Sequence, residues 1–382
     1  MAPTLAVAGV SARAMAEAAA RDGFGVVALD LFGDVDTCRA ASRWLPLGEP
    51  GALRIDPGCT RAALRLLAQH GDVAGWVPGP GFEGLPSLLE DDDGPAGLPL
   101  IGNPADVVRA VRDPQGFFAT LAALGVPHPP VSPVSPPDPS GWLLKDLGGC
   151  GGWQVRPAHG APAGRPAPPR HVYQQLAHGR PMSATFIADA RGAAVLGFNA
   201  QIVQPMGERR WVFAGLVGPV PLPGEVAGAV ADAVDRLAGA FGLRGLGSLD
   251  FLLDGRRWQV LEINPRPPAS LACYADAAPM AAHVQACAQG TLPAGLPRRP
   301  DAPRHVEGHR IVFAPRALRL GAELAGTLAD RADTHDLPCA GARFAAGEPV
   351  CSVSAGGADA AGVRQRLAAA HTHLLDLLET AS

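Results

Sequence analysis

Lys145 is the only lysine in this chain of 382 residues, and a glycine-rich segment follows it closely. Every other basic residue is arginine, so this position stands out against the composition. The apolar stretch 142–144 predicts a strand that delivers the lysine. Glycine backbone N–H groups can close around phosphate oxygens, and an ammonium adds a compact charge that a planar guanidinium does not reproduce. We therefore predict a phosphate-binding loop, the alternative being a surface lysine before a loose turn; its glycines are Gly148, Gly149, Gly151 and Gly152.

A second group of polar residues interrupts two apolar segments between residues 247 and 263. A charged turn separates the segments, so we predict a β-hairpin with Asp250 on one strand and Glu262 on the other. Asn264 lies two residues after Glu262 and shares its face of the strand. Oxygen ligands in this arrangement suit magnesium, which also binds nucleotide phosphates. Arg266 follows and is placed to contact a phosphoryl oxygen. An edge hairpin with ordinary exposed acids is the alternative, and the apolar flanks argue against it.

The elements that must hold these residues begin with alternating strands and helices. Strands are predicted at 5–10, 25–30, 73–77 and 99–102. This alternation predicts a parallel sheet in an N-terminal domain over residues 1–103. The first turn has a single glycine, Gly9, and lacks the G-x-G-x-x-G spacing, so a dinucleotide site is not favoured.

The rest of the chain is predicted to form a central domain over 104–300 and a C-terminal domain over 301–382. Helical patterns cover 106–124, interrupted near Pro114, as well as 225–241 and 359–379. Strands are predicted at 172–176, 184–188 and 195–203, and the segment 304–349 is rich in strands and turns. On the strand 195–203, Asn199 and Gln201 share one face.

The composition excludes several classes of function. A net charge of −4 with mixed signs argues against a general nucleic-acid surface. No apolar run reaches 18 residues, and the first ten residues resemble a strand rather than a signal peptide, so we expect no membrane partner. Seven scattered cysteines without a CxxC pair indicate reduced thiols. These features predict a cytoplasmic protein that acts on small molecules.

Three other patterns are weaker. His305 and His309 lie four residues apart and would suit zinc on a helix, but the glycine between them and the strand-like stretch that follows argue against a helix. Cys150 has no basic partner placed by the sequence, so we expect a small loop-filling residue rather than a nucleophile. Arg209 and Arg210 fit a solvated loop or a substrate contact equally well.

Together these motifs resemble the ATP-grasp superfamily of carboxylate–amine ligases over most of the chain. The resemblance implies an α/β fold with three parts: an N-terminal parallel-sheet domain, a central two-lobed ATP-grasp domain with a flexible lid at 146–153, and a small C-terminal α+β domain. The implied cofactors are ATP and magnesium. The resemblance also implies that Lys145 contacts phosphate and that Arg266 stabilises the transferred phosphoryl group. The implied magnesium ligands are Asp250, Glu262 and Asn264.

The resemblance further implies that adenine binds along a hinge at 173–176. There the backbone N–H of Leu176 would read the base edge, with Gln174, Gln175 and Gln201 as further nucleotide contacts. One departure concerns the ribose. Members of the superfamily usually carry an acid shortly after the hinge, whereas no Asp or Glu lies between residues 172 and 188.

The implied reaction is ATP-dependent amide-bond formation between a small carboxylate and an amine. The carboxylate attacks the γ-phosphate to give an acyl phosphate and ADP, and the amine then displaces phosphate. We expect the carboxylate to bind near Ser11 and Arg13. Segments 9–13, 30–36 and 264–267 resemble the predicted ATP-dependent carboligases of methanogens and methylotrophs. That narrower likeness implies a role in making a one-carbon carrier cofactor of the tetrahydromethanopterin or methanofuran type.

Two alternatives stay open at this point. A nucleotide-binding scaffold could keep the fold without turnover, and the missing ribose acid favours it slightly. A carboxylase that carries its own biotin is disfavoured, since Lys145 is the only lysine. A homodimer is one assembly that the sequence leaves open.

Overall fold

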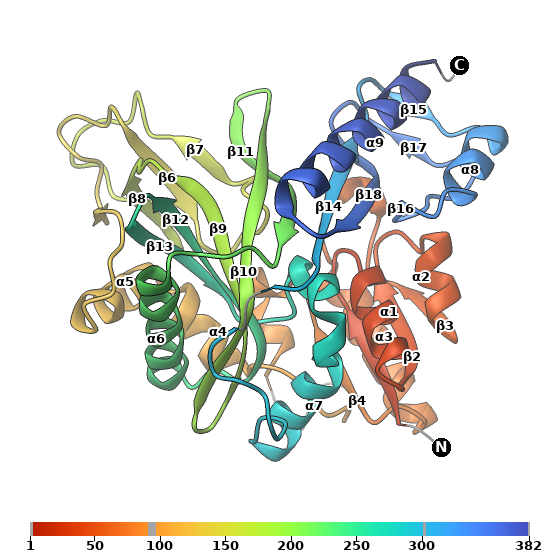
Figure 1. Ribbon diagram of the computed structural model, residues 1–382, viewed down its shortest axis with the longest axis horizontal. Helices are drawn as coiled ribbons and strands as arrows, with labels where there is room; N and C mark the ends of the chain where they lie inside the picture. The colour runs from red at the N-terminus through yellow and green to blue at the C-terminus, as the bar shows by residue number, and fades with distance from the viewer. Residues whose placement is uncertain (1–2, 91–96, 301–302, 381–382) are drawn as a thin grey trace.

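The computed structural model describes residues 3–90, 97–300 and 303–380, which form a mixed α/β protein with one parallel and three antiparallel sheets (Figure 1). The parallel sheet is N-terminal, with the strand order β3-β2-β1-β4. Its strands are β1 (Thr4–Ala8), β2 (Gly25–Asp30), β3 (Arg43–Pro46) and β4 (Gly75–Pro78). The connecting helices are α1 (Arg13–Arg21), α2 (Val35–Ala40) and α3 (Pro57–His70), with short turns at η1 (Pro50–Ala52), η2 (Phe82–Gly84) and η3 (Pro86–Leu88).

The predicted parallel sheet is confirmed, with two differences. Strand β3 was not predicted, because its four residues form no apolar run. The strand predicted at 99–102 is wrong, since this segment makes only an isolated bridge between Trp76 and Leu100. Pro99 has no N–H to donate to a ladder, which limits the pairing that this segment can form.

Two helices lead from the parallel sheet to a small antiparallel sheet. The predicted break near Pro114 is confirmed, because α4 (Ala105–Arg112) ends where the Asp113 carboxylate caps α5 (Pro114–Ala123). The small sheet has the order β5-β8-β6-β7. Its strands are β5 (Val131–Ser132), β6 (Trp142–Asp146), β7 (Val155–Pro157) and β8 (His171–Gln175). Lys145 therefore lies near the end of a strand, as predicted.

The largest sheet is antiparallel, with the order β13-β12-β9-β10-β11-β14-β18-β16. Its central strands are β9 (Arg180–Asp189), β10 (Gly192–Met206), β11 (Arg209–Gly218), β12 (Gly245–Asp254) and β13 (Arg257–Asn264). Strands β14 (Val306–Phe313), β16 (Thr334–His335) and β18 (Pro349–Gly357) continue it. The pairing of β14 with β11 joins the C-terminal strands to the central ones.

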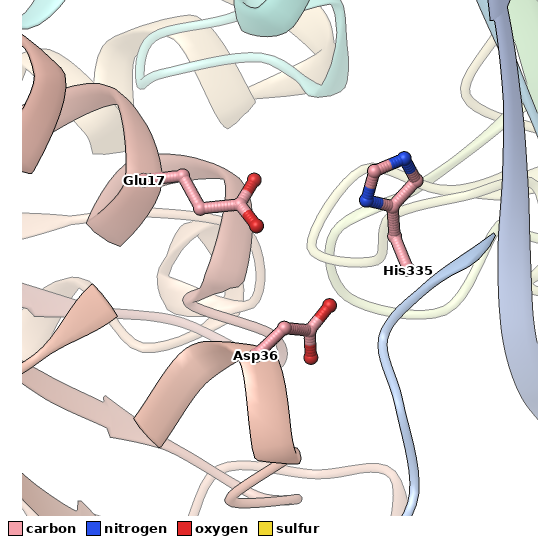
Figure 2. A group of neighbouring side chains, drawn as sticks. All are labelled: Glu17, Asp36 and His335. Atoms are coloured by element: carbon pink, nitrogen blue, oxygen red, sulfur yellow. The ribbon is translucent and has the colours of Figure 1, made fainter. Parts of the chain in front are cut away.

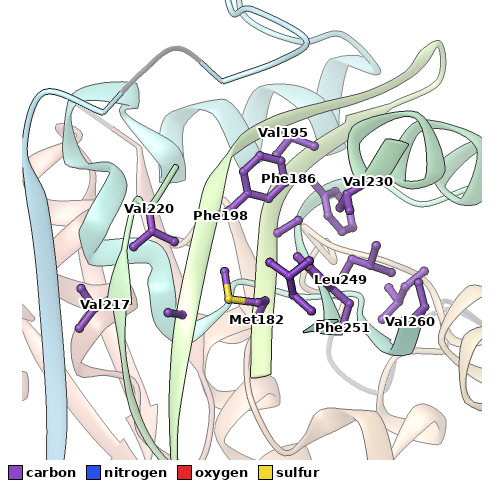
Figure 3. Packing of buried hydrophobic residues seen from close by; sticks show 14 of the residues in the cluster. Met182, Phe186, Val195, Phe198, Val217, Val220, Val230, Leu249, Phe251 and Val260 are labelled. Atoms are coloured by element: carbon purple, nitrogen blue, oxygen red, sulfur yellow. The ribbon is translucent and has the colours of Figure 1, made fainter. Parts of the chain in front are cut away.

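Helices cover both faces of this sheet. Successive residues of a strand point to opposite faces, and β9 shows this: Phe186 packs in the core beneath α6 (Gly224–Phe241), whereas Ile187 packs with α7 (Pro279–Gln289) on the other face (Figure 3). The turn η4 (Ala269–Ala277) and α1 contribute to this second core. The hairpin β12–β13 is thereby fixed between two hydrophobic layers.

The C-terminal part combines strands with two helices. It contains β15 (Leu318–Arg319), α8 (Ala322–Ala329), β17 (Arg343–Phe344) and α9 (Ala360–Thr380). The predicted inward stripe of the last helix is buried, comprising Val363, Leu367, Leu374 and Leu378. The proposed domain boundaries stay predictions, and residues 301–302 at the second one lie outside the described residues. Among the described helices, none is both long and apolar enough to cross a membrane.

Candidate functional site

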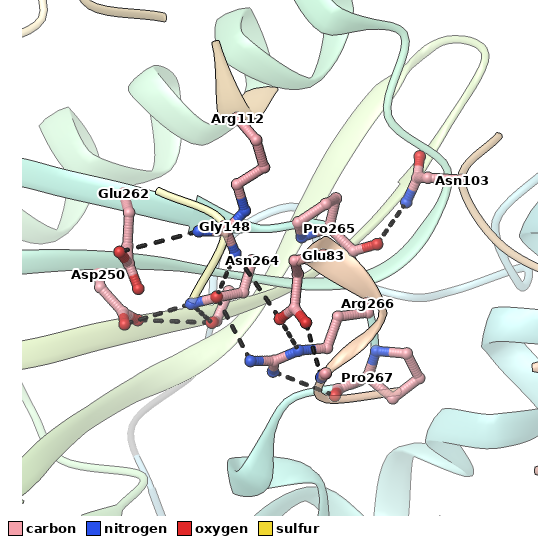
Figure 4. Close-up of polar contacts among 12 residues, drawn as sticks. Glu83, Asn103, Arg112, Gly148, Asp250, Glu262, Asn264, Pro265, Arg266 and Pro267 are labelled. Atoms are coloured by element: carbon pink, nitrogen blue, oxygen red, sulfur yellow. Dashed lines mark hydrogen bonds and ion pairs between the residues drawn. The ribbon is translucent and has the colours of Figure 1, made fainter. Parts of the chain in front are cut away.

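The hairpin β12–β13 carries the predicted acids on neighbouring strands (Figure 4). Asp250 is paired directly with Glu262, and Ser248 is paired with Asn264. Directly opposite residues of an antiparallel pair project to the same side of the sheet. The hairpin therefore gathers Asp250, Glu262 and Asn264 on one face, as the spacing predicted.

Lys145 reaches this face from the small sheet. Its Nζ atom lies 2.8 Å from Oε2 of Glu262 and donates a hydrogen bond of 3.3 Å to the carbonyl of Leu261. The lysine side chain is almost fully buried. A buried ammonium requires such partners, since an unpaired buried charge is strongly unfavourable. The contact joins the two antiparallel sheets across the site.

Two residues of the site, Glu83 and Arg112, were not found from the sequence. Arg112 ends α4 and donates from Nη2 to Oδ1 of Asn264 at 2.9 Å. The same Nη2 atom lies 3.6 Å from Glu83 Oε1, and Nη1 lies 3.9 Å from Glu262 Oε2. Only the position of Arg112 just before an Asp-Pro helix break, and that of Glu83 just after a predicted strand, could have drawn attention to them.

Arg266 is held by an acid from the N-terminal part of the chain. Its Nε atom donates to Oε1 of Glu83 at 2.7 Å, and its Nη2 atom donates to Oδ1 of Asn264 at 3.3 Å. A third bond of 3.3 Å runs from Nη1 to the carbonyl of Pro267. Arg266, Arg112 and Asn264 thus meet at one place, with the Glu83 carboxylate between the two arginines (Figure 4).

The two hairpin carboxyls have opposite electrostatic environments. Burial, followed by the charge of Glu262, raises the pKa of Asp250. Burial also opposes ionisation of Glu262, but Lys145 and Arg112 outweigh it and lower the pKa of that carboxyl. Glu262 is therefore neutralised by protein cations, whereas Asp250 is left with a negative charge that lacks a full counter-charge.

Two side-chain amides lie beside Asp250. Nδ2 of Asn264 donates to Oδ2 of Asp250 at 3.3 Å, and Gln201 also makes a side-chain hydrogen bond to this carboxylate. The structure therefore brings Gln201 into the cluster, as a neighbour of a predicted metal ligand. In this arrangement the Asn264 amide nitrogen faces Asp250, so its oxygen would have to turn toward the carboxylates to bind a metal with them.

The glycine-rich loop lies against β11. The backbone N–H of Gly148 donates to Oδ1 of Asp146, and the carbonyl of Gly151 accepts from the N–H of Phe213. Gly152 has a φ of +75°, and a Cβ atom there would overlap the backbone carbonyl of Trp211. Glycine is required at this position for both reasons. A Cβ atom at Gly149 would meet only the flexible side chain of Gln154, so the restriction there is weaker.

Trp153 and Cys150 of the loop segment are both held by packing against their neighbours. Trp153 packs edge-on against Phe313 of β14, with ring centroids 6.2 Å apart. Burial raises the pKa of the Cys150 thiol to about 11, and the nearby Glu83 acts in the same direction. The thiol is thus kept protonated, in line with a loop-filling role rather than that of a nucleophile.

The predicted hinge lies next to Lys145. Lys145 is paired with Val172 and Leu143 with Gln174, so Gln174 and Lys145 are on the same side of the small sheet. Gln174 is buried, and its Nε2 atom has no hydrogen-bond partner among the described residues. Gln175 is exposed. The N–H of Leu176 donates to the carbonyl of Gly141 at 2.8 Å, so it is not free to read a base in this structure.

Ser11 and Arg13 contact acidic residues outside this cluster. Arg13 donates to Asp336 Oδ1 at 2.8 Å and to Glu17 Oε2 at 2.8 Å, and Ser11 Oγ lies 3.5 Å from Asp336 Oδ1. A substrate carboxylate at Arg13 would have to displace these acids. The two histidines considered for zinc, His305 and His309, lie around the strand β14 and not on a helix.

A family model described as an ATP-grasp domain matches residues 116–270. These residues include Lys145, the glycine loop, the hinge and the whole acidic hairpin. The chain contains an ATP-grasp domain.

Two solved structures share the ATP-grasp architecture beyond this domain. A biotin carboxylase from Campylobacter jejuni in complex with β,γ-ATP is 12% identical with a TM-score of 0.69, covering 98% of this chain and 95% of that one. An L-amino acid ligase from Bacillus licheniformis is 15% identical with a TM-score of 0.67, covering 98% and 97%. At these identities the likeness concerns the fold.

One curated relative is similar in sequence. The carbamoyl phosphate synthase large chain of Thermus thermophilus is 27% identical over 199 residues, which cover 45% of this chain. The match spans only 18% of that much longer protein. The activity of the whole synthase is therefore not transferred to this chain.

The charge imbalance at Asp250 predicts the effect of removing it. In the cation-free protein, Asp250→Asn should raise the free energy of unfolding at pH 7 by about 1 to 3 kcal/mol, because burial and Glu262 disfavour the ionised carboxyl. The raised pKa means that this cost grows as the pH rises from about 4 to about 6 and is relieved in acid. Urea unfolding at pH 7 and pH 4.5 measures it.

A matched control is Asp254→Asn, at the exposed end of the same strand. It should change the free energy of unfolding by less than about 0.5 kcal/mol at both pH values. A destabilised Asp250→Asn protein at pH 7 would show that Asp250 already has sufficient counter-charge.

Proposed function

We propose that this protein is a magnesium-dependent ATP ligase that joins a small carboxylate to an amine through an acyl phosphate. The observation that carries the proposal is a cluster of three cations at the hairpin that the ATP-grasp model matches: Lys145 and Arg112 lie beside Glu262, and Arg266 is bonded to Asn264. Phosphoryl transfer needs positioning and charge neutralisation rather than covalent help from protein, and this cluster offers both.

The described residues fit a nucleotide and its cation. Asp250 and Glu262 present adjacent carboxylates, one of which lacks a full counter-charge, and oxygen ligands of this kind suit magnesium. The buried, unpartnered amide of Gln174 on the same side as Lys145 offers a donor to a nucleotide. When bound, magnesium would neutralise charge on the phosphates.

The chain's own residues would then divide the work. Lys145 exchanges its contact with Glu262 for a phosphate oxygen, and Arg266 is positioned to neutralise charge on the transferred group. Gly148 to Gly152 cover the phosphates and exclude water, which protects an acyl phosphate from hydrolysis. The relatives named an L-amino acid ligase and a carbamoyl phosphate synthase support C–N ligation as the reaction class.

A narrower proposal concerns the substrates. The likeness of segments 9–13 and 264–267 to carboligases of methanogens and methylotrophs supports a one-carbon carrier cofactor as the product. Pterin, tyramine and glutamate compounds are the acids and amines to screen first. ADP release that requires both an acid and an amine supports the ligase, whereas nucleotide binding with no turnover on any pair supports the scaffold alternative.

Lys145 variants test the phosphate role. Lys145→Ala should lower kcat by roughly 100- to 1,000-fold, the scale for losing one preorganised charge-stabilising group. Lys145→Arg should fail nearly as badly, because a guanidinium does not replace a compact ammonium in a buried position. Coupled ADP release with the best acid–amine pair measures both.

Arg156→Ala is the matched control, since Arg156 is an exposed cation on the adjacent strand β7 and should leave kcat within about twofold. Glu262→Gln serves as an inactive reference, because it removes a proposed magnesium ligand. If Lys145→Arg stays within threefold of the wild type, Lys145 does not have the phosphate role.

Nucleotide should also change the exchange of the glycine loop. We expect the amides of residues 147–155 to exchange more slowly with a non-hydrolysable ATP analogue and magnesium, since four glycines have high backbone entropy until phosphate orders them. Hydrogen–deuterium exchange with mass spectrometry measures this, with α9 as an internal control. Equal exchange in both states, once binding of the analogue is established, would exclude this loop as a lid.

A further inference from the structure

A second cluster of potential ligands lies where the N-terminal helices meet the C-terminal strands (Figure 2). Glu17 extends from α1, Asp36 from α2 and His335 from the end of β16. One ligand atom from each lies within 4.8 Å of the other two. His335 lies about 300 positions after the two acids in the sequence. The nucleotide site does not use the three residues, whereas Glu17 is the ion-pair partner of Arg13 in the predicted substrate site.

The hydrogen bonds around the cluster leave its ligand atoms available. His335 Nε2 is bonded to Ser354 Oγ at 2.7 Å, so the other ring nitrogen faces the carboxylates (Figure 2). Oδ2 of Asp36 accepts the N–H of Asp336 at 2.8 Å, which orients the carboxylate and leaves a lone pair on that oxygen. Glu17 uses Oε2 for Arg13, which leaves Oε1. Outer partners of this kind fix the orientation of metal ligands.

The charge around the cluster is also incomplete. Among the described residues, Glu17, Asp36 and Asp336 have ion pairs with one cation, Arg13. Three carboxylates with one guanidinium between them keep a net negative charge, which a bound metal ion would offset.

We propose that Glu17, Asp36 and His335 bind a divalent first-row transition ion of the zinc class, which links the N-terminal helices to the C-terminal strands. Two carboxylates and one imidazole form a borderline donor set that suits such an ion better than magnesium. Metal–ligand bonds of about 2.1 Å place tetrahedral ligand atoms roughly 3.4 Å apart, so the ligand atoms must close in by up to roughly 1.4 Å. The site is separate from nucleotide binding, and its test needs neither nucleotide nor substrate.

Zinc titration by calorimetry, on the full chain without nucleotide, tests the proposal. The wild type should bind one zinc ion at this site, and His335→Gln and Glu17→Gln should each weaken that binding by at least about 10- to 100-fold. His305→Gln is the matched control, because His305 is an exposed histidine paired with Glu307 and should leave the affinity unchanged. Glu262→Gln should also still bind one zinc ion, which would show that this ion does not bind at the hairpin β12–β13.

Thermal unfolding provides a second measurement. Zinc should raise the Tm of the wild type, because a ligand that binds only the folded state stabilises it, and should not raise that of His335→Gln. If circular dichroism shows that His335→Gln is misfolded, the variant Ser354→Ala is used in its place. This variant removes only the hydroxyl that is bonded to His335 Nε2, and it should still weaken zinc binding about 10-fold or more. Absence of zinc binding by the wild type, or binding that persists unchanged in the folded variants, for example on exposed cysteines, would overturn the proposal.

Discussion

The constraint on which the site depends is the pairing of buried charge. Lys145 and Arg112 are buried, Arg266 beside them is mostly covered, and each requires an acid or an amide oxygen close by. Removing one partner from such a pair leaves a desolvated charge, which costs more than the pair itself contributes. The acids come from two regions of the chain, Glu83 from the N-terminal part and Glu262 from the large sheet. The charge balance therefore holds three regions of the fold at one point.

In the proposed function, this balance would also prepare the site for an anion and a cation that bind together. Without them, Lys145 neutralises Glu262 and leaves Asp250 short of counter-charge. A metal ion would replace the lysine at Glu262, and phosphate oxygens would replace the carboxylate at Lys145. The metal ion would thus pair with Glu262 and the phosphate with Lys145. Neither charged side chain would be left without a partner of opposite charge in the low-dielectric interior. Protein cations that are already desolvated need little reorganisation for this exchange.

The sequence predicted the parts of the site that depend on local pattern. The hairpin of Asp250 and Glu262, the strand before Lys145 and the glycine at 152 follow from alternation, turn residues and backbone freedom, all of which are local. Glu83 and Arg112 were missed because their partners lie more than 150 positions away and arginine is too common to stand out. The contacts that Arg13 and the Leu176 N–H make within the fold depend on tertiary neighbours, as does the short strand β3, and no local pattern in the sequence indicates them.

The continuity of the large sheet has a consequence for how the chain can be divided. Strand β11 presents one edge to β10 and the other to β14, which belongs to the predicted C-terminal domain. A chain cut near residue 300 would leave the outer edge of β11 with unpaired N–H and C=O groups over Gly215 to Gly218, beside an uncovered Trp153. Bare edges of this kind template pairing with other chains. The C-terminal segment thus serves as a cap against self-association, whatever else it contributes.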